Sequence, residues 1–157
     1  MEYVEKVNDY IKRANKNLLF VEEAYKKGED VYEFTQLLSV FVFSLVLYNE
    51  NIYLDTNPIR FHGFECEVLG NNTYPYDFRK NTYQFINHLR NACCHEGVTI
   101  ESIDKQIEYV IFTDEKYLYE NNIKKELLNK VNIKLNKEQI KKIFEYLVEN
   151  VELLKRK

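Results

Sequence analysis

The sequence predicts an all-α fold, an up-and-down helical bundle that forms a single domain over residues 1–157. Three observations support it. Apolar side chains recur at steps of three and four near the start of the chain, as on one face of an amphipathic helix. The apolar run from Leu37 to Tyr48 has the length of a buried helix and is too short to span a bilayer. Residues 54 to 76 hold both prolines and two glycines, which indicates a long loop between the second and third helices.

The first helix should close at Lys26-Lys27-Gly28, where basic residues precede a glycine stop. Its apolar face consists of Val4, Val7, Ile11, Ala14, Leu18, Val21 and Tyr25. The second helix is expected over roughly residues 31 to 52, with Asp30 as its N-cap. Because this helix is apolar nearly all round, it must be covered on all sides, by the core or by a partner chain.

The third helix is expected from about Asp77 to His95. Its core face contains Phe78, Thr82, Phe85, Ile86, Leu89, Ala92 and Cys93. A separate polar ridge recurs at steps of four, three and four, and it contains Gln84, His88, Asn91 and His95. The helix therefore presents two distinct faces, one apolar and one polar.

The pattern after Gly97 is less regular. Residues 100–107 are expected as a short helical turn. The runs 109–113 and 131–135 are strand-like, and they could pair as a small β-hairpin around residues 124–130, which are helical in character. Asn136 is then expected to cap a final helix. The apolar face of that helix contains Ile140, Ile143, Phe144, Leu147, Val151 and Leu154.

Composition limits the classes of function. A net charge of -3 argues against a broad basic groove, so any contact with RNA must be a local patch. Three cysteines do not make a disulfide framework, which favours the reducing cytoplasm, and the charged N-terminus is unlike a signal peptide. Cys93 and Cys94 are adjacent, without Cys-x-x-Cys spacing. We therefore expect no metal site, no cofactor and no membrane association.

Arg90, Asn91 and His95 are the residues best suited to chemistry. A guanidinium holds phosphate through several donors, and an imidazole can take a proton and return it. Asn91 can orient either group. The alternatives remain a salt bridge for Arg90, a helix-capping role for His95 and a plain surface position for Asn91. Arg90 and His95 lie roughly 140° apart around a helix axis, so two facing helices could form a composite site more easily than one.

This stretch resembles the signature of the HEPN family, in which Arg is followed by a polar residue, three to five further residues and His. Residues 85–89 look like the apolar lead-in of that signature. The resemblance implies a helical, homodimeric, metal-independent endoribonuclease, often a toxin or a phage-defence component, with an antitoxin or a regulatory protein as a further partner. It also implies that Arg90, Asn91 and His95 are catalytic. One departure is Glu96, which stands between the histidine and the glycine.

Cations mixed with aromatic residues suit stacking on unpaired bases, and such a mixture lies in and beside the loop between residues 55 and 76. The candidates for binding the RNA substrate are Arg60, His62, Arg79 and Lys80, together with Gln84 and His88 on the third helix. The alternative is that aromatic plugs only anchor the loop. Two other functions also remain open: a non-catalytic HEPN-like module that binds a nucleotide, RNA or a partner protein, and a structural dimerisation domain.

Overall fold

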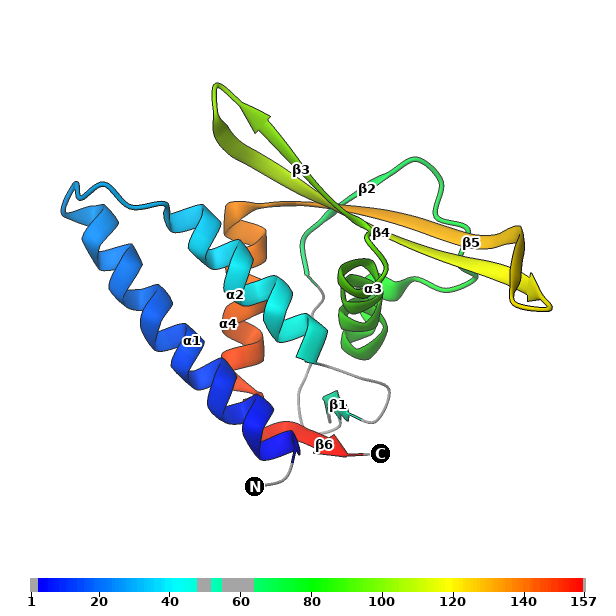
Figure 1. Cartoon of the computed structure of the whole chain (residues 1–157), viewed down its shortest axis with the longest axis horizontal. Coiled ribbons are helices and arrows are strands. Elements are labelled where there is room, and N and C mark those ends of the chain that lie inside the picture. The colour runs from blue at the N-terminus through cyan, green and yellow to red at the C-terminus, as the bar shows by residue number, and fades with distance from the viewer. Residues whose placement is uncertain (1–2, 48–51, 55–63, 157) are drawn as a thin grey trace. The chain divides into compact units, whose positions relative to one another are not determined.

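The computed structural model describes residues 3–47, 52–54 and 64–156. The chain divides into two compact units (Figure 1). The first consists of Met1–Arg60 and Lys137–Lys157, and the second of Phe61–Asn136. Each unit has its own helices and its own sheet.

The first unit is mainly helical, and its three α-helices contact one another. Its elements are α1 (Tyr3–Lys26), α2 (Glu33–Leu47), β1 (Ile52–Leu54), α4 (Lys137–Glu149), the 3-10 turn η2 (Val151–Leu153) and β6 (Leu154–Arg156). Strands β1 and β6 pair antiparallel as a two-stranded sheet. Two ion pairs join α4 to its neighbours, from Lys141 to Glu22 at 3.0 Å and from Lys137 to Glu33 at 3.4 Å.

The predicted end of the first helix is confirmed. Helix α1 stops at Lys26, and Gly28 has a φ of 78°, a left-handed conformation that glycine adopts without a steric penalty. Helix α2, in contrast, begins at Glu33, so Asp30 lies too far upstream to be its N-cap. Residues 48–51 of the expected second helix lie outside the described residues.

Helix α2 buries one side and leaves apolar side chains exposed on another. Its buried apolar residues are Leu37, Leu38, Val40, Phe41 and Leu45. Phe43 is 49% exposed and Val46 40% exposed, although the ring of Phe43 meets Tyr10 of α1 edge-on at 4.9 Å. Within the described part of the chain, this helix is therefore not covered on all sides.

The second unit combines one helix with an antiparallel sheet. Its elements are β2 (Glu67–Leu69), the 3-10 turn η1 (Phe78–Lys80), α3 (Thr82–Cys94), β3 (Val98–Ile103), β4 (Gln106–Glu120) and β5 (Ile123–Asn136). The strand order is β2-β5-β4-β3. Figure 1 shows β4 and β5 as a long hairpin, and helix α3 packs against β4.

The prediction of an all-α fold is wrong, because the four-stranded sheet makes the fold mixed. The expected helical turn over residues 100–107 is instead the end of β3, a two-residue turn and the start of β4, and the supposedly helical residues 124–130 belong to β5. The expected loop over residues 54–76 contains β2, and β1 ends at its first residue. The hairpin before the last helix is confirmed but is far longer than expected, with Val110 opposite Leu135 in its register.

Side-chain alternation and turn geometry explain the hairpins. In the parts of β4 and β5 that lie farther from their connecting turn, every second residue is buried. These residues are Val110, Phe112 and Asp114 on β4, and Val131, Ile133 and Leu135 on β5. The two-residue turns at 104–105 and 121–122 have positive φ at both positions, as type I′ hairpin turns require. These turns join β3 to β4 and β4 to β5.

The apolar face predicted for the third helix is confirmed, since all its members are buried except the half-buried Cys93. The helix itself is shorter than predicted. It begins at Thr82, after η1, and the side chain of Asn81 accepts a hydrogen bond from the Gln84 amide at 3.0 Å as an N-cap. His95 occupies the C-cap position.

The connection from α3 to β3 brings two backbone segments close together. Glu96 adopts a left-handed φ of 59°, and the Gly97 amide bonds back to the Ala92 carbonyl at 2.8 Å. The Gly97 carbonyl accepts a hydrogen bond from the Thr113 amide at 2.7 Å. A Cβ at Gly97 would lie 2.1 Å from the Thr113 carbonyl oxygen, so only glycine fits there. This contact fixes the end of α3 beside β4.

Candidate functional site

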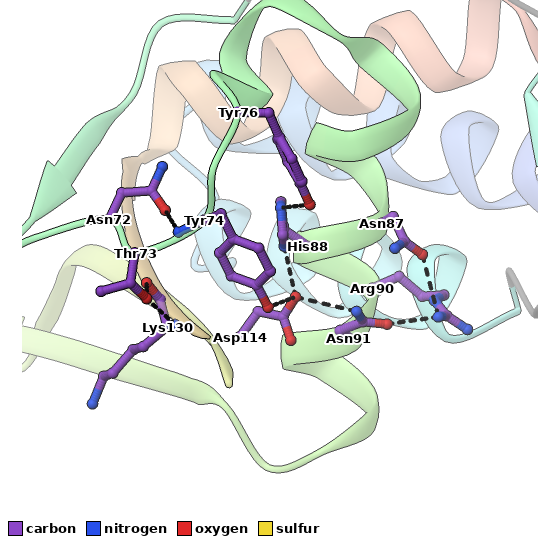
Figure 2. A network of polar contacts seen from close by, with 10 residues as sticks. All are labelled: Asn72, Thr73, Tyr74, Tyr76, Asn87, His88, Arg90, Asn91, Asp114 and Lys130. Atoms are coloured by element: carbon purple, nitrogen blue, oxygen red, sulfur yellow. Dashed lines mark hydrogen bonds and ion pairs between the residues drawn. The ribbon is translucent and has the colours of Figure 1, made fainter. Parts of the chain in front are cut away.

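A buried carboxylate on β4 is the centre of the polar site. Asp114 continues the inward alternation of Val110 and Phe112, and it is only 6% exposed. It faces His88 of α3 and Tyr74 of the segment before that helix (Figure 2). A buried carboxylate is costly unless its lone pairs accept hydrogen bonds, so its donors define the site.

His88 is the nearest donor to Asp114. Its Nδ1 atom lies 2.6 Å from Asp114 Oδ2, and its Nε2 atom lies 3.2 Å from the hydroxyl of Tyr76. The rings of Tyr74 and Phe78 meet the imidazole edge-on, at 4.5 and 5.3 Å between centroids. Both ring nitrogens therefore have partners, and the residue as a whole is 2% exposed.

Two further donors reach the same carboxylate oxygen. The Asn91 amide donates to Asp114 Oδ2 at 3.1 Å, and the Tyr74 hydroxyl donates at 3.4 Å. Burial raises the pKa of Tyr74, and the Asp114 charge raises the same pKa further. The hydroxyl of Tyr74 consequently stays protonated and available as a donor.

Arg90 joins this network through Asn91. Its Nη2 atom donates to Asn91 Oδ1 at 2.6 Å and to Asn87 Oδ1 at 3.2 Å (Figure 2). The Nε atom of Arg90 is buried and has no hydrogen-bond partner within the described part of the chain. The guanidinium is thus held by two amide oxygens of its own helix, and one of those amides bonds to Asp114.

His95 is placed differently from the other residues of the signature. It is exposed at the C-terminal end of α3, where its backbone amide donates to the Asn91 carbonyl at 3.0 Å. Within residues 64–156, no hydrogen bond or ion pair joins its imidazole to Arg90 or to Asn91. One chain therefore brings Arg90 and Asn91 together and leaves His95 open to solvent.

The expected RNA-binding residues are dispersed. Gln84 is half-buried, whereas Arg79 and Lys80 are exposed and pair with Asp77 at 3.1 and 3.9 Å. The hydrogen bond from Arg79 lowers the pKa of Asp77. His88, expected on the polar ridge of the third helix, is buried in the network around Asp114. Arg60 and His62 lie outside the described residues.

The described end of the 55–76 loop is fastened to the sheet and to α3. The Thr73 amide donates to the Lys130 carbonyl at 3.2 Å, and the Lys130 amide donates to Thr73 Oγ1 at 2.7 Å (Figure 2). The Asn72 side chain accepts from the Tyr74 amide at 2.9 Å. These bonds place Tyr74 beside His88, so this part of the loop has an anchoring role.

Sequence reasoning missed Asp114, Tyr74 and Tyr76. A signal for Asp114 existed in the alternation of Val110 and Phe112, because the next inward position of the strand is 114. No local pattern pointed to the two tyrosines. Among residues 3–47, 52–54 and 64–156, no three His, Cys, Asp or Glu side chains are grouped as metal ligands would be.

Comparison with known proteins identifies a family to which the chain is similar. The family model described as HEPN pEK499 p136 matches residues 1–154, a range that includes residues of both units. Neither the search of curated proteins nor that of solved structures found a match. No helix in the described residues is long and apolar enough to cross a membrane.

Proposed function

The chain belongs to the HEPN pEK499 p136 family, and on this premise we propose that it is a metal-independent endoribonuclease. His95 takes the proton of a ribose 2'-hydroxyl, and the resulting oxyanion attacks the adjacent phosphorus. The bond to the 5'-oxygen breaks, that oxygen receives a proton, and a 2',3'-cyclic phosphate remains. Arg90 holds the charge that develops on the phosphorane, and Asn91 orients Arg90.

The observation that carries this proposal is the hydrogen-bonded guanidinium of Arg90 on α3, the helix that His95 caps at its C-terminal end. Both of its hydrogen bonds to Asn87 and Asn91 use Nη2. Within the described residues, both of these bonds leave Nη1 without a partner and the buried Nε atom has none either, so guanidinium donors are left for a phosphate oxygen. A preorganised donor loses little freedom when it binds a charged oxygen, and this favours transition-state stabilisation.

We propose that the site is completed by a second copy of the chain. In regular helix geometry, positions five residues apart, such as Arg90 and His95, are separated by roughly 140° around the axis, whereas two facing copies of α3 can bring the two residues to one phosphate. The exposed side chains of Phe43 and Val46 on α2 are candidates for the dimer interface. We further propose that such an enzyme acts in the cytoplasm as a toxin or phage-defence effector, restrained by an antitoxin or a regulatory protein.

Incubation of the purified protein with RNA in EDTA tests the chemistry. We expect cleavage to persist and to leave a 2',3'-cyclic phosphate or its opened product. His95→Ala should reduce the rate by about 10²- to 10⁴-fold, as loss of a positioned acid or base does. Cys94→Ala, a change at the exposed neighbouring position, is the control and should retain activity. Cleavage that stops in chelator and returns with a divalent ion would exclude this mechanism.

A non-catalytic module that binds RNA, a nucleotide or a partner is the second candidate. Two observations within one chain favour this second candidate. Arg90 is already engaged by two amides, while the described residues give the His95 imidazole no orienting partner. An RNA that binds in an Arg90-dependent manner, yet stays intact over long incubation at any protein concentration, would establish this alternative.

A further inference from the structure

The hydrogen-bond directions around Asp114 are dictated by its chemistry. An ionised carboxylate has only acceptors, so every group that contacts its oxygens must donate. Asn91 has both a donor and an acceptor on its amide, and the amide could be turned either way. Because Asp114 takes the amide nitrogen at 3.1 Å, the amide oxygen must face the opposite direction. That oxygen is the one that accepts from Arg90 at 2.6 Å.

His88 in turn fixes the carboxylate. Its Nδ1 atom donates to the same oxygen at 2.6 Å, and its Nε2 atom is held by the Tyr76 hydroxyl at 3.2 Å. The edge-on ring of Tyr74 and the stacked ring of Tyr76 pack against the imidazole, and His88 is only 2% exposed. The network therefore runs from Tyr76 through His88, Asp114 and Asn91 to Arg90, and it combines α3, β4 and the segment before α3.

We propose that Asp114 is a positioning residue that sets the orientation of the Arg90 guanidinium through Asn91, with His88 holding Asp114 in place. This inference rests on the proposed function, since Arg90 is there the group that holds the phosphate. Asp114 itself is buried and does not touch RNA. A purely structural role, in which the network only ties α3 to β4, is the competing explanation. The test therefore needs a readout at Arg90 itself.

The Arg90 guanidinium can be observed by NMR in protein labelled with ¹⁵N-arginine, with Arg90→Lys used to assign its signals. Asp114→Asn keeps the size of the side chain but replaces one carboxylate oxygen by an NH2 group that can donate a hydrogen bond. The Asn91 amide can then point either its oxygen or its nitrogen toward position 114. We expect the Arg90 signals to shift and the rotation of its guanidinium to accelerate. Glu115→Gln is the matched control, since the neighbouring carboxylate bonds Tyr117 and Lys130 instead. It should leave the Arg90 signals unchanged.

A second variant, Asn91→Ala, tests the same link if the Asp114→Asn protein does not fold. Asn91→Ala leaves the pair of His88 and Asp114 intact and breaks the link to Arg90. It should release the guanidinium to a similar extent. In that background Asp114→Asn should have no further effect on the Arg90 signals, because Asp114 acts through Asn91. Unchanged Arg90 signals in Asn91→Ala, or in a folded Asp114→Asn protein, would overturn the proposal.

Cleavage kinetics separate this inference from the proposed ribonuclease. A misoriented Arg90 should lower kcat by about 10- to 100-fold in Asp114→Asn, with a much smaller change in KM. A wild-type protein that never cleaves RNA would overturn the ribonuclease proposal. The NMR signals of Arg90 would still decide whether Asp114 positions it. The two proposals therefore fail on different measurements.

Discussion

At the scale of single residues, the buried pair of His88 and Asp114 couples stability to the candidate site. Asp114 is almost inaccessible to water and accepts three hydrogen bonds on one oxygen. Removing one partner of a buried hydrogen-bonded carboxylate is far more costly than replacing both partners, because the remaining group stays desolvated without compensation. The pair should therefore behave as a unit in mutagenesis.

We expect His88→Leu to lower the free energy of unfolding by about 3 kcal/mol, since it removes the closest donor of Asp114. The double variant His88→Leu/Asp114→Leu should lose less than the sum of the two single variants. Urea unfolding followed by circular dichroism measures these differences. His95→Leu, at the exposed end of the same helix, is the control and should change stability little. Strict additivity of the two single changes would refute the coupling.

The adjacent cysteines should differ in reactivity. Burial raises the pKa of the Cys93 thiol to about 12, with a further contribution from Cys94, whereas Cys94 is exposed. Only a thiolate attacks a disulfide reagent, so Cys93 should react slowly at pH 8 and faster as the pH rises toward that pKa. Dithionitrobenzoate should label Cys94 quickly in the folded protein. The rapid phase should disappear in Cys94→Ser and remain in Cys93→Ser; the reverse pattern would show that the pKa assignment is wrong.

Residue-level prediction from the sequence succeeded for contacts within one helix and failed for contacts across the chain. The adjacency of Arg90 and Asn91 made their interaction easy to foresee. Periodicity placed His88 on a polar ridge, but it cannot say what that ridge meets. The partner, Asp114, lies 26 residues further along the chain, on a strand whose extent was underestimated.

At the scale of elements, the end of α3 combines a strained residue with an irreplaceable glycine. Glu96, between His95 and Gly97, occupies a left-handed position that usually belongs to glycine. Gly97 then passes so close to Thr113 that no side chain can be accommodated. The two adjacent positions therefore have opposite tolerance to substitution.

Glu96→Gly should stabilise the protein by about 1 kcal/mol, because it removes the steric cost of a left-handed residue with a Cβ. Gly97→Ala should destabilise it by about 3 kcal/mol, because the new methyl group overlaps a backbone carbonyl oxygen that cannot move aside cheaply. The melting temperatures of the two variants, compared with that of the wild-type protein, show whether each substitution stabilises or destabilises. If Gly97→Ala melted at the wild-type temperature, the close approach of the two backbones would be disproved.

Helices were predicted better than strands for a physical reason. Helices α1, α3 and α4 each have one apolar face, and that face generates a clear period. The outer half of the long hairpin has no buried face, since residues 118–128 are all exposed. Register shifts after Lys116 and Leu118 further disturb its alternation. Its turn contains two asparagines and no glycine, so the turn signal was weak as well.

At the scale of the whole molecule, a single chain does not bring Arg90 and His95 together. The family match spans nearly the whole chain, and the exposed apolar side chains of α2 remain available for a partner. The sequence suggested this arrangement through the angular separation of the two residues. It could not identify the interface, because which surfaces of two folded copies fit together is not a property of local sequence.

Mixing of two inactive variants tests whether two chains share one site. In a symmetric dimer each site would take Arg90 from one chain and His95 from the other. Chains carrying Arg90→Ala and chains carrying His95→Ala should each be inactive alone. Random exchange makes half of the dimers mixed, and one of the two sites in each mixed dimer is intact. The mixture should therefore recover about one quarter of wild-type activity.

The control is the double variant Arg90→Ala/His95→Ala mixed with either single variant, which cannot assemble an intact site and must stay inactive. Sedimentation at micromolar concentration should show a dimer, since an interface of at least about 1,000 Å² is expected for a stable assembly. Phe43→Lys on α2 should weaken the dimer and the activity together, because it places a charge on an exposed apolar position of the candidate interface. A monomer that cleaves RNA at full rate, or single variants that never restore one another, would show that each chain carries its own complete site.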